Sequence, residues 1–214
     1  MGDSMYTKKY FLVIIILIII ITITGCAKAG TITEKNDTDV LAIISANSNS
    51  QYEKTFKDLN IGYLFDFNLK INKADTSWVD IWVEGYEDGK PMEPFKLTSL
   101  SYGLSPKKTE EGNAGFGIIN GDELQLFIYS AGIKSKPINI IYNFIDIPGI
   151  STWDYAIGSE KVNLIDGEEK VLAVYRKGEN QLRAAYNYQD HNSIKEMITD
   201  DKVVLLLKIK VEER

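Results

Sequence analysis

Residues 61–72 read IGYLFDFNLKIN, and this stretch decides the fold class. Large apolar side chains occupy every second position in it, namely Ile61, Tyr63, Phe65, Phe67, Leu69 and Ile71. A helix would scatter these side chains around its circumference, whereas a strand places all of them on one face. The stretch therefore predicts a half-buried β-strand.

Further short strands are expected on both sides of this one, separated by turn residues. They are Val40–Ile44, Trp78–Tyr86, Phe95–Leu104, Phe116–Ile119, Leu124–Tyr129, Ile138–Ile145, Lys161–Ile165, Val171–Arg176, Leu182–Tyr188 and Val203–Val211. The pairs Asp88-Gly89, Asn120-Gly121 and Asp166-Gly167 suit type I′ hairpin turns, whose two central residues need a positive φ. About ten short strands without a long helical period predict an all-β fold, an antiparallel β-sandwich.

Two other features of the chain bear on this architecture. One short helix is expected near the C-terminus, at Ser193–Ile198, because Ser193 and Glu196 have the spacing of a capping box. Residues 47–51 are polar and are expected to form a loop. We expect residues 39–214 to form a single β-sandwich domain, with a split near Pro148-Gly149 as the alternative.

The N-terminal segment has the layout of a signal peptide. Lys8 and Lys9 precede an apolar run, Phe11–Thr24, which ends at Gly25 and Cys26. A membrane-spanning helix needs about 20 predominantly apolar residues, so the run is short for a permanent span.

Ile23, Thr24, Gly25 and Cys26 resemble a lipobox, the cleavage signal of bacterial lipoproteins, in which an aliphatic residue, a small residue and Gly or Ala precede a Cys. The resemblance covers residues 1–26 alone. It implies that residues 1–25 are removed and that the Cys26 sulfur carries a diacylglyceryl group. Two acyl chains hold a protein firmly at a bilayer, whereas one binds marginally. An uncleaved anchor is the alternative, and both place the domain outside the cytoplasm.

Residues 26–38 link the lipidation site to the domain. After Cys26 they are small, polar and charged, as expected of a flexible tether. We therefore expect the protein on the extracytoplasmic face of the cell membrane, bound through the lipid on Cys26. The Ile-, Lys- and Asn-rich composition suggests an AT-rich genome, and we expect a Gram-positive host.

Charge and composition exclude several functions. The whole chain carries a net charge of −6, and residues 1–25 carry +1, which leaves −7 for the remainder. An acidic surface repels phosphate backbones, so no nucleic-acid partner is expected. With Cys26 lipidated, His191 is the only remaining soft ligand, so no zinc site is expected, whereas calcium binding stays open. Gly115 and Gly117 lack the context of a phosphate loop and predict a bulge or a close backbone approach.

The strand expected at Trp78–Tyr86 has two different faces. Val79, Ile81 and Val83 point one way and are expected to face the core. The other face alternates rings with carboxylates through Trp78, Asp80, Trp82, Glu84 and Tyr86. Exposed rings beside carboxylates could bind a carbohydrate or a protein. Alternatively, a loop such as Ser105–Asn113, or the tether, covers them as a secondary cluster.

These features predict a non-catalytic, lipid-anchored binding protein with no cofactor, whose ligand is a protein or a carbohydrate. The alternative is a structural or accessory subunit of a cell-envelope complex. A third hypothesis is a hydrolase that relies on Asp80 and Glu84, because carboxylates distant in sequence can converge in a fold. No catalytic residues are indicated by spacing.

Overall fold

The computed structural model describes residues 40–142, 144 and 148–214. The signal peptide, Cys26 and the tether lie outside the described residues, so the predictions made for them stay predictions. Among the described residues, no helix combines the length and the apolar character needed to cross a membrane.

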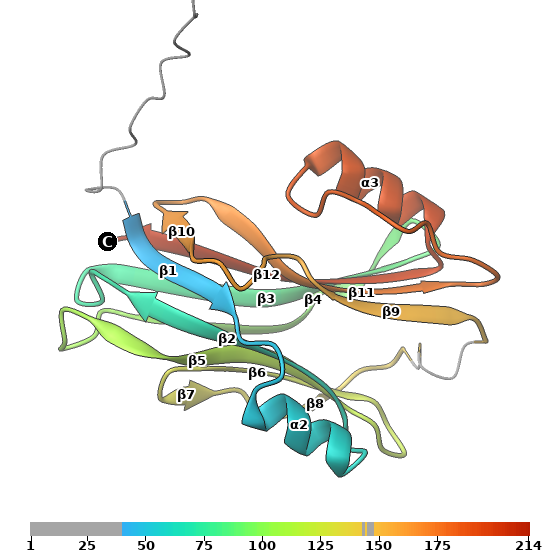
Figure 1. Cartoon of the computed structure of the whole chain (residues 1–214), viewed down its shortest axis with the longest axis horizontal. Helices are drawn as coiled ribbons and strands as arrows, with labels where there is room; N and C mark the ends of the chain where they lie inside the picture. The colour runs from blue at the N-terminus through green and yellow to red at the C-terminus, as the bar shows by residue number, and fades with distance from the viewer. Residues whose placement is uncertain (1–39, 143, 145–147) are drawn as a thin grey trace, which may run out of the picture. The chain divides into compact units, whose positions relative to one another are not determined.

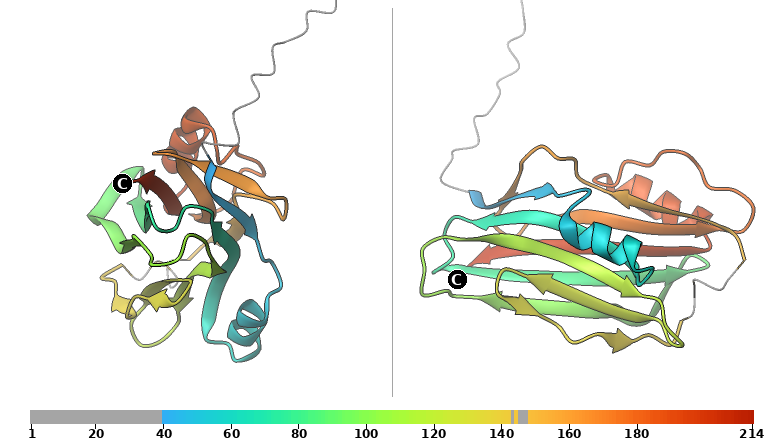
Figure 2. Two further views of the ribbon diagram at one scale, coloured as in Figure 1. Left: turned by 90° about the vertical axis from the view of Figure 1, so that its left-hand side faces the viewer. Right: turned by 60° about the horizontal axis from the view of Figure 1, so that its bottom comes forward.

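The described residues form two antiparallel sheets that face each other in two layers (Figures 1 and 2). The larger sheet has the order β10-β1-β2-β5-β6-β7, and β8 also pairs with β6. The smaller sheet has the order β4-β3-β12-β11-β9. The larger sheet consists of β1 (Val40–Ala46), β2 (Gly62–Ile71), β5 (Glu110–Ile119), β6 (Gln125–Ser130), β7 (Ile133–Lys134), β8 (Ile138–Asn139) and β10 (Val162–Ile165). The smaller sheet consists of β3 (Ser77–Glu87), β4 (Lys90–Gly103), β9 (Ile150–Tyr155), β11 (Glu169–Gly178) and β12 (Val203–Glu213). The prediction of an antiparallel β-sandwich is confirmed.

The core lies between the sheets and follows the alternation seen in the sequence. On β2, Phe65, Phe67, Leu69 and Ile71 are all buried. On β3, Val79, Ile81 and Val83 are buried as expected and belong to the same cluster. Tyr63 is 43% exposed despite its place in the pattern. It lies beyond the core, where its ring stacks on Trp153 with centroids 4.0 Å apart.

The helix expected near the C-terminus is present as α3 (His191–Asp200). Its N-cap is Asp190 rather than Ser193, because the Asp190 side chain accepts a hydrogen bond from the Ser193 backbone N–H. α3 covers part of the outer face of the smaller sheet, where Met197 packs on Val204 and Leu206.

Two assignments at the edge of the smaller sheet were wrong. Residues 182–188, expected as a strand, are irregular, and their Tyr186 and Tyr188 hydroxyls donate to Asp200 and Asp154. The edge position beside β11 is taken by β9, which the sequence pattern did not indicate. Residues 182–188 instead lie against α3 and β9.

A helix that was not expected, α2 (Gln51–Asp58), follows β1. Its N-cap is Ser50, whose side chain accepts a hydrogen bond from the Glu53 N–H at 3.2 Å. None of its residues is buried, and it lies beside the outer face of the larger sheet (Figures 1 and 2). α2 forms one wall of the groove described next.

Candidate functional site: an aromatic groove on the larger sheet

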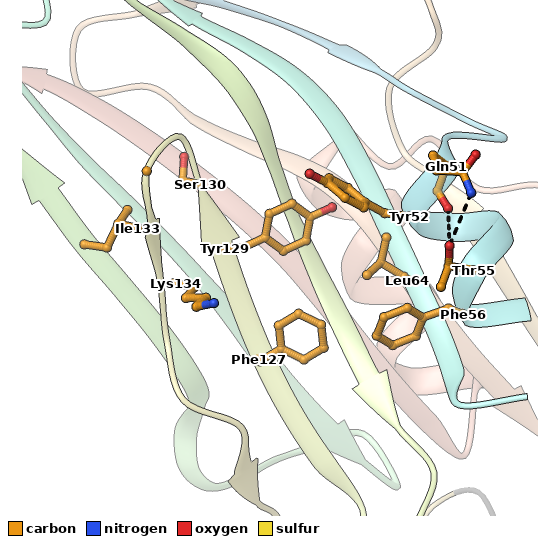
Figure 3. A pocket seen from close by; sticks show the side chains of 11 residues that line it. Gln51, Tyr52, Thr55, Phe56, Leu64, Phe127, Tyr129, Ser130, Ile133 and Lys134 are labelled. Carbon is orange, nitrogen blue, oxygen red and sulfur yellow. Dashed lines mark hydrogen bonds between the residues drawn. The ribbon is translucent and has the colours of Figure 1, made fainter. Parts of the chain in front are cut away.

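An open groove of about 680 Å³ lies on the outer face of the larger sheet. It lies between α2 and the hairpin that contains β7 (Figure 3). The lining consists mainly of aromatic and aliphatic side chains: Gln51, Tyr52, Thr55, Phe56, Leu64, Phe127, Tyr129, Ser130, Gly132, Ile133 and Lys134. A mostly apolar concave site with a few polar groups is typical of small-molecule binding.

Two rings of β6 form the floor of the groove. Phe127 and Tyr129 point outward because they alternate with the buried residues Leu126 and Ile128. Their ring centroids are 6.2 Å apart, and the ring planes differ by 28°. The two rings therefore present one nearly continuous apolar surface (Figure 3).

Glycines on the neighbouring strand allow these rings to lie close to the sheet. Gly117 pairs with Phe127 and Gly115 pairs with Tyr129 in the β5–β6 register. A Cβ atom on Gly117 would lie 2.1 Å from the Phe127 ring, and one on Gly115 would lie 2.4 Å from the Tyr129 hydroxyl. Of the two predictions for these glycines, the close approach is confirmed. Because they have no Cβ atom, Gly115 and Gly117 leave room for the rings of Tyr129 and Phe127.

The helix α2 supplies two more rings along one side of the floor. Tyr52 meets Tyr129 edge-on with centroids 6.1 Å apart, and Phe56 lies 5.9 Å from Phe127. Such contacts are the favoured geometries of aromatic pairs. Because α2 buries no residue in the core, these contacts position the helix and thereby set the width of the groove.

The opposite side of the groove carries its single charged residue. Lys134 pairs directly with Tyr129 in the β6–β7 register, so both side chains stand on the same face of the sheet. Figure 3 shows Lys134 on the side of the floor rings opposite to α2. None of the other lining residues carries a carboxylate, imidazole or thiol.

A buried carboxylate at the hydroxyl end of the Tyr129 ring fixes this ring. Asp66 is 0% exposed, and it accepts hydrogen bonds from the Tyr129 hydroxyl at 2.8 Å and from the Asn47 amide at 2.8 Å. The Asn113 amide donates to both of its oxygens, at 2.9 and 3.1 Å. Burial, and then the Asp66 charge, raise the pKa of Tyr129 far above its ordinary value. Tyr129 therefore stays protonated and remains a hydrogen-bond donor to Asp66.

A second cavity, of about 320 Å³, lies on the other side of α2. Its lining includes Lys57, Trp153 and Tyr155. The Tyr155 hydroxyl accepts a hydrogen bond from the Asp66 N–H and donates to Glu53 of α2. The second cavity is smaller and more polar than the groove. Both cavities are lined by α2 and lie next to the residues around Asp66.

The ring-and-carboxylate face expected on β3 lies on the outer face of the smaller sheet. Trp82 is 3% exposed and Glu84 is 5% exposed, and the Trp82 indole N–H donates to Glu84 at 2.8 Å. The Tyr86 hydroxyl and the Lys208 ammonium also contact the Glu84 carboxylate, at 3.0 and 2.9 Å. Lys96 lies 4.5 Å from the centroid of the Trp82 ring. Trp82 can therefore stack on a ligand only if its neighbours move.

The outer members of the same face are more accessible. Trp78 is partly exposed and lies under the Arg214 guanidinium, which is 4.3 Å from the ring centroid. Asp80 accepts a hydrogen bond from Ser101. Neither Asp80 nor Glu84 lines the groove or the second cavity, and the hydrolase hypothesis stays untested. A role of this face in binding a partner stays a prediction.

Searches against protein-family models, curated proteins and solved structures find no match for the chain. Within the described part of the chain, no three His, Cys, Asp or Glu side chains are grouped closely enough to hold a metal ion. The groove was not found by sequence reasoning because its lining comes from three separate segments, residues 51–56, Leu64 and residues 127–134. Phe127 and Tyr129 were assigned to a strand, but only their pairing with two glycines signals a ring platform.

Proposed function

We propose that this protein is a non-catalytic, lipid-anchored binding protein, and that the groove on its larger sheet holds a small ligand with a flat apolar body. The observation that carries the proposal is the floor of Phe127 and Tyr129, kept flat on the sheet by Gly115 and Gly117. Rings held in place before binding lose little conformational entropy when a ligand stacks on them.

The rest of the groove also suits binding rather than chemistry. Its lining offers no acid–base pair and no nucleophile with an adjacent base. The lining is mainly aromatic and aliphatic, and one of its few polar groups, the Ser130 hydroxyl, is already paired with the Tyr102 hydroxyl. The groove therefore favours a ligand that is mostly apolar over the carbohydrate expected from the sequence.

The position of the protein in the cell completes the proposal. Cys26 at the end of the apolar leader supports attachment to the outer face of the cell membrane, and residues 27–38 would then separate the binding domain from the bilayer. Such a domain would capture its ligand outside the cytoplasm.

An accessory subunit of an envelope complex remains the second candidate, and one observation favours it. Three isoleucines in the segment after β6 are exposed, with Ile133 at 37%, Ile138 at 42% and Ile141 at 91%. Clustered exposed apolar residues can mark a protein interface. The purified domain separates the two candidates, since a ligand-binding protein should bind alone and an accessory subunit should need its partner.

The groove is tested with a neutral fluorescent probe, N-phenylnaphthylamine, added to residues 39–214 purified as a folded domain. We expect probe fluorescence to rise on binding, and Phe127→Ala to weaken affinity roughly tenfold, because half of the floor is lost. Trp78→Ala is the matched control, since it removes a partly exposed ring from the other sheet. Loss of binding with Trp78→Ala but not with Phe127→Ala would place the site on the β3 face instead.

The anchor is tested by growing the native host with radiolabelled palmitate. We expect the wild-type chain to carry label in the membrane fraction and Cys26→Ser to carry none, because the acyl chains are attached through the Cys26 sulfur. Tyr10→Ser in the leader is the control and should leave labelling intact. Label on Cys26→Ser, or none on the wild type, would contradict lipidation at this residue.

A further inference from the structure

We propose that the ligand of the groove is an organic anion, with its flat body on Phe127 and Tyr129 and its negative group on the Lys134 ammonium. This inference rests on the proposed function and deepens it. It assigns to the ligand a charge as well as a shape, and it assigns to Lys134 the role of selecting that charge.

The distribution of charge supports an anion. The chain as a whole is acidic, with a net charge of −6, yet the single charged residue of the groove lining is a lysine. Some lysines in the described residues have carboxylate partners, as in the contacts of Lys202 with Asp88 and of Lys208 with Glu84. Lys134 forms no ion pair with any described residue. A lysine without a carboxylate partner, beside an apolar surface, complements an anion with an apolar body.

The geometry places this charge within reach of a stacked ligand. Lys134 lies on β7, a strand of two residues that follows the turn at Gly132, and it pairs with Tyr129 of β6. Gly132 has a φ of 73°, which turns the chain back so that Lys134 stands beside the floor rather than beyond it. The flexible side chain of lysine can then place its ammonium over the edge of a ligand lying on the two rings.

The negative charge of Asp66 does not cancel the preference of the groove for an anion. Asp66 is fully buried, and its oxygens are occupied by the hydroxyl of Tyr129 and by the amides of Asn47 and Asn113. Lys134 is exposed and lies on the ligand side of the rings. A ligand on the floor can therefore reach the ammonium, whereas the Asp66 carboxylate is buried and already accepts hydrogen bonds from three side chains.

The test compares two probes that share one ring system. Anilinonaphthalene sulfonate carries an anionic group, and N-phenylnaphthylamine is the same body without it. Affinities are measured by fluorescence for the wild type, for Lys134→Ala and for Lys136→Ala. Lys136 is the matched control because it is an exposed lysine two residues further along the chain and does not line the groove.

We expect the wild type to bind the anionic probe more tightly than the neutral one. Lys134→Ala should weaken binding of the anionic probe roughly threefold to fivefold more than binding of the neutral probe, as for the loss of one partly exposed ion pair. The difference between the wild-type affinities for the two probes should shrink as salt is added, because salt screens the charge of Lys134. Lys136→Ala should leave both affinities unchanged.

The outcomes that contradict this inference differ from those that contradict the proposed function. Equal affinity for the two probes, or equal losses in Lys134→Ala and Lys136→Ala, would overturn the anion assignment while the groove remains a binding site. Binding of neither probe by a domain with a native circular dichroism spectrum would overturn the binding function, and the anion assignment with it.

Discussion

Asp201→Ala is expected to lower the free energy of unfolding by about 3–5 kcal/mol, because it leaves a buried guanidinium without its counter-ion. Asp201 follows α3, and its carboxylate accepts hydrogen bonds from Arg176 at 2.6 Å from Nε and 3.3 Å from Nη2. The side chains of the pair are 1% and 3% exposed. Arg176 lies under the ring of Tyr186, so little water can reach the charge once the carboxylate is gone.

Urea unfolding followed by circular dichroism measures this change. Glu196→Ala is the control, because it breaks an ion pair with Arg183 in which both side chains are about half exposed, and its midpoint should not move. The double variant Arg176→Met, Asp201→Leu should recover part of the loss, since it removes both charges together. A midpoint for Asp201→Ala equal to that of Glu196→Ala would show that solvent reaches Arg176 freely.

The sequence predicted those parts of the sandwich that depend on short-range alternation. The period of two along β2 and β3 assigned Phe65, Phe67, Val79 and Ile81 to the core because a strand allows no other arrangement of those side chains. The Asp88-Gly89 turn was also predicted, and both residues have the positive φ, 50° and 75°, that a type I′ hairpin requires.

Elements that depend on distant partners were not predicted. α2 has only Tyr52 and Phe56 as large apolar residues, and both find their contacts on β6, far along the chain. Its one local signal was Ser50 three residues before Glu53, which is the spacing of a capping box. Pairing with β11 makes β9, and not residues 182–188, the edge strand of the smaller sheet.

The candidate site was harder to predict than the fold for the same reason. The alternation of rings and carboxylates on β3 was visible in the sequence, but the burial of Trp82 depends on Lys96 and Lys208 from neighbouring strands. The groove depends on the register that places Gly117 beside Phe127, which no local pattern contains.

Asp66→Ala is expected to lower the free energy of unfolding by about 2–4 kcal/mol and to weaken binding of the neutral probe to the groove. The substitution leaves the Tyr129 hydroxyl and the amides of Asn47 and Asn113 without the acceptor they share. Each buried donor without a partner destabilises the fold, and the Tyr129 ring loses the hydrogen bond that fixes its orientation in the floor.

Asn113→Ala separates these two effects. It removes one donor and leaves the Tyr129 and Asn47 hydrogen bonds to Asp66 in place, so we expect a loss of about 1 kcal/mol and unchanged probe affinity. The free energy of unfolding of both variants is measured by urea unfolding, and their probe affinity is measured by titration without urea. Probe affinity that is unchanged in a folded Asp66→Ala domain would show that the rings of α2 and the two glycines orient Tyr129 without the carboxylate. Reduced affinity in Asp66→Ala but not in Asn113→Ala would show that the buried Asp66 carboxylate, which the sequence pattern did not indicate, holds the binding surface in place.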